Sequence, residues 1–183
     1  MESILVVGLG NPGPKYNKNR HNIGFRILDH LANDKNISIQ SKKKFEVGEG
    51  LEEGWKIFLL KPLEFMNLSG NAVGEISRMY KIPIENTIIL HDELDIPFGS
   101  IKTKLGGGTA GHNGLKSISE MLGSNSYARI RFGVGKPPVP GPDISDWVLQ
   151  NFSEDEEAAL PNLIQQSLDK LKVWFYETRK RSH

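Results

Sequence analysis

Five short polar clusters contain the residues that could carry out chemistry. A histidine with an ordinary pKa of ~6.5 can accept a proton near neutral pH, and a carboxylate bonded to its other ring nitrogen fixes the tautomer and stabilises the imidazolium. His21 and Asp92 are the pair that we predict to act in this way. The clusters are Asn11, Arg20-His21-Asn22, Phe65-Met66-Asn67, His91-Asp92-Glu93-Leu94-Asp95 and His112-Asn113.

Asparagines recur in these clusters, and their amides can orient and polarise a carbonyl group without a charge that would compete with a base. The sequence has no cysteine, and no serine lies in a nucleophile-elbow motif. The simplest reaction is therefore hydrolysis of a polar carbonyl compound by water, with general-base help worth roughly 10²–10⁴ in rate. A metal site is the alternative, although its residues lack the i, i+4 spacing of zinc-binding helices. Its ligands would be His91, Asp92 and Asp95 with His21 or His112.

Apolar runs and helical spacings alternate along the chain, and they predict the elements that position these clusters. Alternating strands and helices are typical of α/β layers, whose ligand sites form at the ends of strands. No composition shift marks a domain boundary, so we predict a single domain over residues 1–183. Strands are expected at 3–9, 44–48, 55–61, 87–91, 101–105 and 129–134, and helices at 23–31, 72–80 and 115–122.

The C-terminal part of the sequence predicts a loop followed by helices. The proline-rich segment at about 136–148 is expected to form a semi-rigid loop that flanks the cleft. Ser153 and Glu156 match a capping box, which marks the start of a helix. Pro161 is expected to open a second helix, because proline is favoured at the first helical position.

The charge is balanced overall but not along the chain. The sequence has 23 lysine and arginine residues against 22 acidic ones, which leaves a net charge of +1. Residues 101–136 contain six basic residues and one acidic residue, a distribution that suits a polyanion such as nucleic acid, although a solvated surface explains it equally well. Because no apolar run approaches the ~20 residues of a membrane span and the first residues lack a signal-peptide pattern, we expect a soluble cytoplasmic protein.

Two glycine-rich motifs match nucleotide-binding fingerprints only in part. Residues 8–13 have the spacing G-x-G-x-x-G, but residues 15–20 lack the apolar period of the helix that should follow. Residues 106–111 have the glycine spacing of a phosphate-binding loop, but His112 and Asn113 stand where lysine and serine or threonine are required. Both motifs are therefore weak evidence for a nucleotide site.

Several specific blocks occur in a fixed order from one end of the chain to the other. They are Gly8-Leu-Gly-Asn-Pro-Gly13 with Tyr16 and Arg20-His-Asn22, Lys61-Pro62 with Phe65-Met-Asn-Leu-Ser-Gly70, His91-Asp-Glu-Leu-Asp95, Lys104-Leu-Gly-Gly-Gly108 with Gly111-His-Asn-Gly114, and Arg131-Phe-Gly-Val-Gly135. Together these blocks resemble those of bacterial-type peptidyl-tRNA hydrolases, a likeness that any single block would support only weakly.

This resemblance implies an α/β domain with a mixed, mostly parallel sheet between helices, and an esterase that releases peptides from peptidyl-tRNA without a cofactor or metal. The partner would be the 3′ CCA end and acceptor stem of the tRNA. By position, His21 would be the general base that activates water, Asp92 would hold its basic form, and Asn11 would distinguish N-blocked peptidyl groups from free aminoacyl groups. The remaining matched residues would line the cleft for the 3′ end and the peptide (Tyr16, Phe65, Asn67, Asn113) or grip a tRNA phosphate (Lys104, Arg131).

The chain departs from the commonest family pattern at three places beside these residues, which are Asn19, Glu64 and Thr109-Ala110. A hydrolase-like protein that only binds RNA is the competing function, but the retained base, aspartate and amides argue against it. We expect a monomer with no membrane association and no obligatory protein partner.

Overall fold

The computed structural model describes residues 1–138 and 143–182, whose strands form one mixed sheet of seven strands. The order across the sheet is β2-β3-β4-β1-β5-β7-β6. The four central strands β4, β1, β5 and β7 run parallel, and the flanking strands pair antiparallel with their neighbours. The strands are β1 (Ser3–Gly8), β2 (Ile39–Ser41), β3 (Phe45–Glu52), β4 (Trp55–Pro62), β5 (Thr87–Glu93), β6 (Ile101–Leu105) and β7 (Ala128–Gly133).

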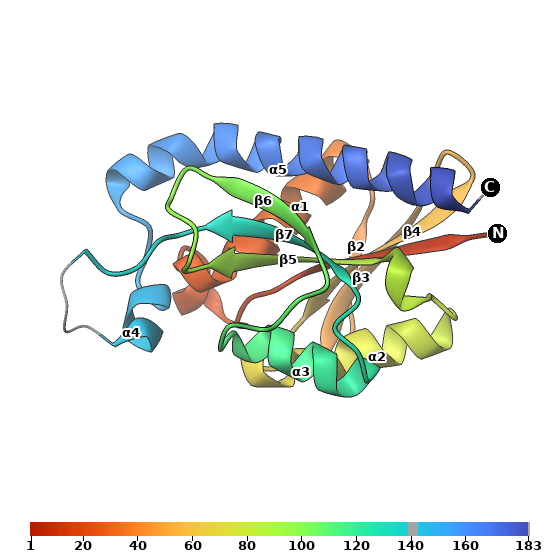
Figure 1. Ribbon diagram of the computed structural model, residues 1–183, viewed down its shortest axis with the longest axis horizontal. Helices are drawn as coiled ribbons and strands as arrows, with labels where there is room; N and C mark the ends of the chain where they lie inside the picture. The colour runs from red at the N-terminus through yellow and green to blue at the C-terminus, as the bar shows by residue number, and fades with distance from the viewer. Residues whose placement is uncertain (139–142, 183) are drawn as a thin grey trace.

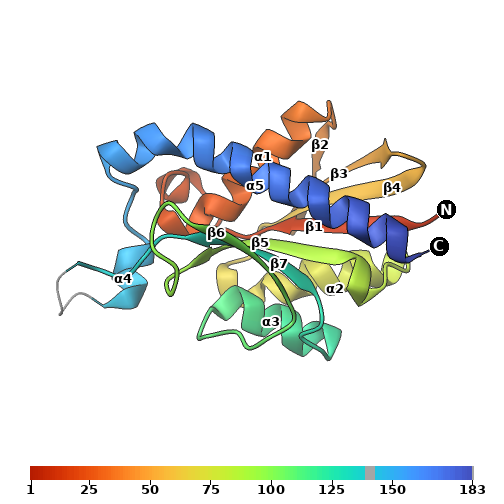
Figure 2. The same ribbon diagram turned by 45° about the horizontal axis from the view of Figure 1, so that its top comes forward.

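Helices cover both faces of the sheet, as Figures 1 and 2 show. Successive strand residues point to opposite faces, so in β1 Ile4 and Val6 pack on the side of α1 and α5, whereas Leu5 and Val7 pack on the side of α2 and α3. No helix of the described residues is long and apolar enough to cross a membrane. The helices are α1 (Ile23–Asp34), α2 (Ser69–Met79), α3 (Asn113–Leu122), α4 (Ile144–Val148) and α5 (Glu154–Arg181), with 3₁₀ turns η1 (Pro14–Tyr16), η2 (Arg20–Asn22), η3 (Met66–Leu68) and η4 (Ile84–Asn86).

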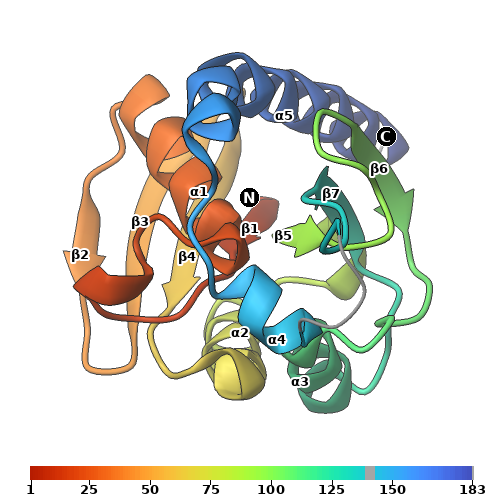
Figure 3. The same cartoon turned by 90° about the vertical axis from the view of Figure 1, so that its left-hand side faces the viewer.

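The central strand β1 is the point where the strand order reverses, because β4 lies on one side of it and β5 on the other. Ligands of α/β sheets bind beyond the carboxyl ends of the strands at such a point. Figure 3 looks onto this edge, with α4 in front of it and the start of α1 beside it. A Cβ atom at Gly24 would lie 2.3 Å from the carbonyl oxygen of Leu90, so only glycine lets α1 begin this close to β5.

The α/β fold class and the predicted strands and helices are confirmed, and β2 and α4 are additions that the patterns did not predict. The expectation that Pro161 opens a second helix is wrong, because α5 runs through it without a break. A proline within a helix costs about 3 kcal/mol, but burying Leu160, Leu163 and Ile164 on the sheet contributes about 1.5–3 kcal/mol each. Within the segment at about 136–148, α4 forms at its end and residues 139–142 lie outside the described residues.

Candidate active site

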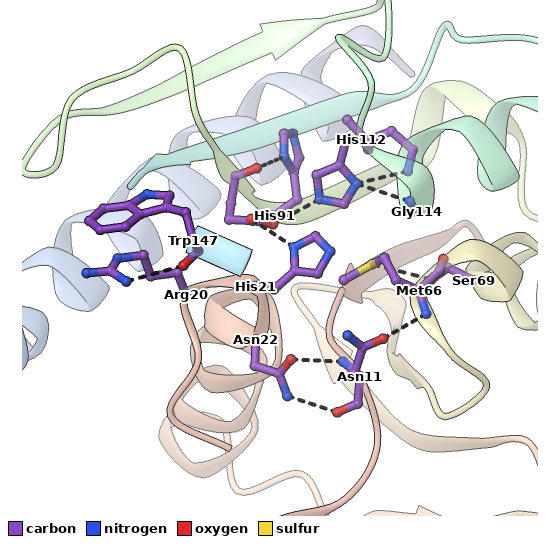
Figure 4. Close-up of polar contacts among 12 residues, drawn as sticks. Asn11, Arg20, His21, Asn22, Met66, Ser69, His91, His112, Gly114 and Trp147 are labelled. Atoms are coloured by element: carbon purple, nitrogen blue, oxygen red, sulfur yellow. Dashed lines mark hydrogen bonds and ion pairs between the residues drawn. The ribbon is translucent and has the colours of Figure 1, made fainter. Parts of the chain in front are cut away.

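The structure brings His21 and Asp92 together at the carboxyl edge of the sheet. Asp92 is the sixth of the seven residues of β5, all of which are buried. His21 lies in η2, the turn that leads directly into α1. Nδ1 of His21 and Oδ2 of Asp92 are 2.8 Å apart, and the two side chains are 14% and 2% exposed (Figure 4). Because Nδ1 is bonded to Asp92, Nε2 is the ring nitrogen left to meet a reactant.

The environment of the pair favours its charged form. Burial lowers the pKa of His21, but the charge of Asp92 and the hydrogen bond with it outweigh burial, so this pKa lies above its ordinary value of 6.5. Burial alone would raise the pKa of Asp92, but the two neighbouring histidines hold it well below its usual range. Asp92 therefore stays a carboxylate that accepts a hydrogen bond from the Nδ1–H group of His21.

A second histidine, His112, also contacts Asp92, although the sequence offered it only as a member of a polar cluster and as a candidate ligand of the alternative metal site. Its Nε2 lies 2.9 Å from Oδ1 of Asp92. Its Nδ1 accepts hydrogen bonds from the backbone N–H groups of Gly114 and Leu115, at 3.1 and 3.3 Å, and so caps the start of α3. The capping role could have been predicted from the position of His112 just before the predicted helix, where N-cap residues lie.

The ligand atoms of His21, Asp92 and His112 lie within 4.8 Å of one another, which is close enough for a metal ion. The helix cap argues against a metal there. Nδ1 of His112 accepts two N–H groups and therefore carries no proton, so the ring proton sits on Nε2, the atom that would have to bind the metal. Asp95, another member of the alternative metal site, instead pairs with Lys136 at 3.3 Å.

Asn11 is held rigidly beside the pair by hydrogen bonds at both its backbone and its side chain. Its N–H donates to Oδ1 of Asn22 and its carbonyl oxygen accepts from Nδ2 of Asn22, both at 2.9 Å. Its Oδ1 accepts from the backbone N–H of Met66 at 2.8 Å. Figure 4 shows these residues on the side of His21 away from His112. The Asn11 amide is therefore oriented before any ligand binds.

A pocket of about 260 Å³ opens beside the His21–Asp92 pair, between α4 and the glycine loop that precedes α3. Asn113 lines this pocket together with the pair. The other predicted cleft residues do not line it. Tyr16 and Phe65 make an edge-to-face contact with ring centroids 6.4 Å apart, and Phe65 is 54% exposed. Asn67 is exposed in η3, next to the anchored Met66.

Arg20, which precedes His21, ties the η2 turn to α4. Its guanidinium lies 3.5 Å from the centroid of the Trp147 ring, and its Nη2 pairs with Glu156 at 2.9 Å. Its backbone N–H donates to the carbonyl oxygen of Gln150 at 3.1 Å. Because α4 also forms a wall of the pocket, these contacts fix that wall relative to His21.

The basic residues of segment 101–136 do not all reach the surface. Arg129 is only 2% exposed, and its guanidinium donates to the carbonyl oxygens of Gly106 and Gly108. Gly107 has a φ of 97°, a conformation that favours glycine, and a Cβ atom there would lie 2.7 Å from that guanidinium. Arg131 donates from Nε to Glu93 at 3.1 Å, and Lys104 is exposed on β6. Strand register places Lys104 and Arg131 on the same face of β6 and β7.

The three departures from the family pattern have ordinary local roles. Asn19 forms an isolated bridge with Asn151, which adds to the attachment of the α4 region. Glu64 accepts a hydrogen bond from Asn71 at 3.1 Å. Ala110 adopts a positive φ of 49° in the glycine loop, where a non-glycine residue is uncommon.

His91 predicts a measurable dependence of stability on pH. Burial, followed by the effect of His112, lowers its pKa from 6.5 to about 3. Below pH 6.5 His91 is therefore protonated in the unfolded chain but stays neutral in the native state. The free energy of unfolding should consequently fall by up to about 1.4 kcal/mol per pH unit as the pH drops below 6.5. Urea unfolding at pH 6.5, 5.5 and 4.5 measures this slope. His91→Gln should flatten it, and an equal slope in that variant would assign the loss to other groups.

Fold and site together define a class: a single-sheet α/β protein with a histidine–aspartate acid–base pair at the switch point of its sheet. Comparison with known proteins narrows that class. The family model described as peptidyl-tRNA hydrolase matches residues 5–182, and the chain belongs to this family.

Relatives and solved structures agree with that assignment. The chain is 51% identical over 171 residues to peptidyl-tRNA hydrolase of Geotalea daltonii, which covers 92% of this chain and 88% of the relative. It is 45% identical to the enzyme of Mycolicibacterium smegmatis, with 94% and 91% covered. The crystal structure of peptidyl-tRNA hydrolase from Acinetobacter baumannii superposes with a TM-score of 0.89 at 37% identity, and 97% of this chain and 91% of that chain are covered.

Proposed function

We propose that this protein hydrolyses the ester bond of peptidyl-tRNA and so releases free tRNA and a peptide. The His21–Asp92 pair carries this proposal, because it presents a histidine with a fixed Nδ1 partner to an open pocket. A water molecule is the nucleophile, since the sequence has no cysteine and His21 has no serine partner among the described residues.

In the proposed reaction, Nε2 of His21 takes a proton from water as the water oxygen attacks the ester carbon. The bond between that carbon and the ribose oxygen then breaks, and the proton passes from His21 to the leaving oxygen. Asp92 accepts the Nδ1–H bond throughout and stabilises the transient imidazolium. An amide that donates to the developing oxyanion adds on the order of 3 kcal/mol of transition-state stabilisation.

Asn11 is the proposed discriminator between N-blocked and free aminoacyl groups. Its backbone is held by Asn22 and its side-chain Oδ1 by the N–H of Met66, so the amide is already ordered when the substrate binds. The free amino group of an unblocked aminoacyl-tRNA is protonated. It would lose its hydration beside Asn11 without gaining an oppositely charged partner. The remaining residues proposed to hold the 3′ CCA end and the peptide are Tyr16, Phe65, Asn67 and Asn113.

Lys104 and Arg131 are the proposed contacts to a tRNA phosphate at the acceptor stem, because both lie on one face of the β6–β7 pair. Lys104→Ala should weaken tRNA binding several-fold at low salt and reduce the slope of log affinity against log salt by about 1. Fluorescence titration at several salt concentrations measures both quantities. Lys172→Ala is the matched control, since Lys172 is exposed on α5 across the sheet. Equal slopes in the two variants would place the phosphate elsewhere.

Incubation of the pure protein with N-acetyl-aminoacyl-tRNA tests the function directly. We expect release of the acetylated amino acid and much slower attack on unblocked aminoacyl-tRNA. Intact ester in both cases would refute the proposal, and tRNA binding without release would favour the RNA-binding alternative. Loss of activity on chelation, with recovery on adding a divalent ion, would instead support the metal alternative.

The remaining parts of the proposal concern the protein as a whole. Residues 1–183 would act as one domain, with the segment at about 136–148 flanking the cleft. The chain would work as a monomer, without a cofactor or obligatory protein partner. Its place of action would be the cytoplasm, where translation supplies peptidyl-tRNA.

A further inference from the structure

Asp92 is shared between two histidines through its two separate oxygens. Oδ2 lies 2.8 Å from Nδ1 of His21, and Oδ1 lies 2.9 Å from Nε2 of His112. The carboxylate is nearly inaccessible to solvent, so these two contacts dominate its hydrogen bonding. Because both oxygens belong to one carboxylate group, a change in the His112 contact must also change the carboxylate that His21 contacts.

The helix α3 fixes the tautomer of His112 independently of Asp92, although the contact with the Asp92 carboxylate requires the same tautomer. Two backbone N–H groups at the first turn of the helix, from Gly114 and Leu115, point at its Nδ1. A proton on that nitrogen would face both of them, so the proton stays on Nε2. His112 is consequently a fixed donor to Asp92, held in place by the helix that follows it.

We propose that His112 is a positioning residue: its fixed Nε2–H proton orients the Asp92 carboxylate toward His21 and weakens the pull of Asp92 on the His21 proton. This inference rests on the proposed hydrolysis. A carboxylate with one oxygen already bonded to a donor is a weaker base than a free one, because its charge is partly stabilised. A buried aspartate that faced His21 alone would hold the imidazolium more strongly. Less of the histidine would then be the free base near neutral pH.

The other charged groups around the pair do not duplicate this effect. On β5, His91 donates from Nδ1 to the backbone carbonyl of Asp92 at 2.8 Å, and Glu93 is bonded to Arg131 of β7. From η2, Arg20 points away to α4 and α5. The α4 wall faces the pocket with side chains that do not titrate in this range, which are Ile144, Ser145 and Val148.

Two substitutions separate the two bonds of His112. His112→Asn places an amide oxygen near the former Nδ1, where it can still cap α3, but its side chain is too short to donate to Asp92 as well. His112→Gln places an amide N–H near the former Nε2, where it can still donate to Asp92, but it loses the cap. His30→Asn is the control for removing a histidine, because His30 is exposed on α1.

NMR titration of the His21 ring gives a readout that does not depend on hydrolysis, with the His21→Ala spectrum identifying its signals. In His112→Asn we expect the pKa of His21 to rise by roughly 0.5–1 unit and the acid limb of kcat/KM to move up in pH with it, while the melting temperature is kept. In His112→Gln we expect the His21 titration of the wild type and a melting temperature lower by about 2–4 °C. His30→Asn should change neither quantity.

An unchanged His21 titration in His112→Asn would overturn the inference, and so would equal shifts in the Asn and Gln variants, which would indicate a purely structural role. Failure of the proposed function is a different result, since it appears as a wild-type protein that does not release the ester. The two failures are therefore distinguishable in one set of experiments.

Discussion

Release of an N-acetylated amino acid from tRNA should fall by roughly 10²–10⁴-fold in kcat when His21 is replaced by alanine, because the only proposed acceptor for the proton of water is lost. Affinity for tRNA should stay close to that of the wild type. The ring of His21 contributes little exposed surface, and the proposed phosphate contacts, Lys104 and Arg131, lie on β6 and β7.

Single-turnover kinetics with saturating enzyme separates the chemical step from binding in this experiment. His30→Ala serves as the matched control, since His30 is exposed on α1 and does not line the pocket beside His21. A His21→Ala protein with wild-type turnover would remove His21 from the mechanism. A protein that loses tRNA affinity and turnover together would show that the ring serves binding.

Much of the fold follows from periodicity alone. Strands such as β5 are buried on both faces, so their apolar runs stand out from the turns that bound them. The elements that could not be predicted are the ones stabilised by distant partners. The helix α4 has five residues, and Trp147 holds it through Arg20 and the carbonyl oxygen of Gly135. Likewise, Pro161 is tolerated in α5 because neighbouring side chains are buried on the sheet.

The residues of the candidate site whose chemistry follows from their type could be predicted from the sequence. The contacts that depend on the path of the folded chain could not. His21 and Asp92 are 71 positions apart, yet both follow from strand-end placement and from the chemistry of a histidine beside a carboxylate. His112 shows the limit. Its contact with Asp92 depends on the path of the glycine loop, which brings His112 beside the end of β5. Arg129 fixes that path by donating hydrogen bonds to two carbonyl oxygens of the loop. Counting charges therefore assigned Arg129 to a basic surface when it is buried in a structural role.

Asp92→Asn should be about as damaging as loss of His21, with kcat reduced by roughly 10²–10⁴-fold although the new side chain has nearly the same shape. The reason lies in the fixed Nε2–H of His112. That donor requires an oxygen opposite it, so the amide oxygen must face His112 and the amide NH₂ must face Nδ1 of His21. His21 then keeps its proton on Nε2, and a protonated Nε2 cannot accept a proton from water.

This orientation argument makes a sharper prediction for the double variant Asp92→Asn with His112→Asn. Removing the fixed donor lets the new amide turn its oxygen toward His21, which can then carry its proton on Nδ1 and present a free Nε2. The double variant should therefore be faster than Asp92→Asn alone, even though it contains one more substitution in the site. Measuring kcat for the wild type, both single variants and the double variant completes a mutant cycle. If the activation free energies lost in the two single variants simply add in the double variant, His112 does not determine the orientation of the carboxamide at position 92.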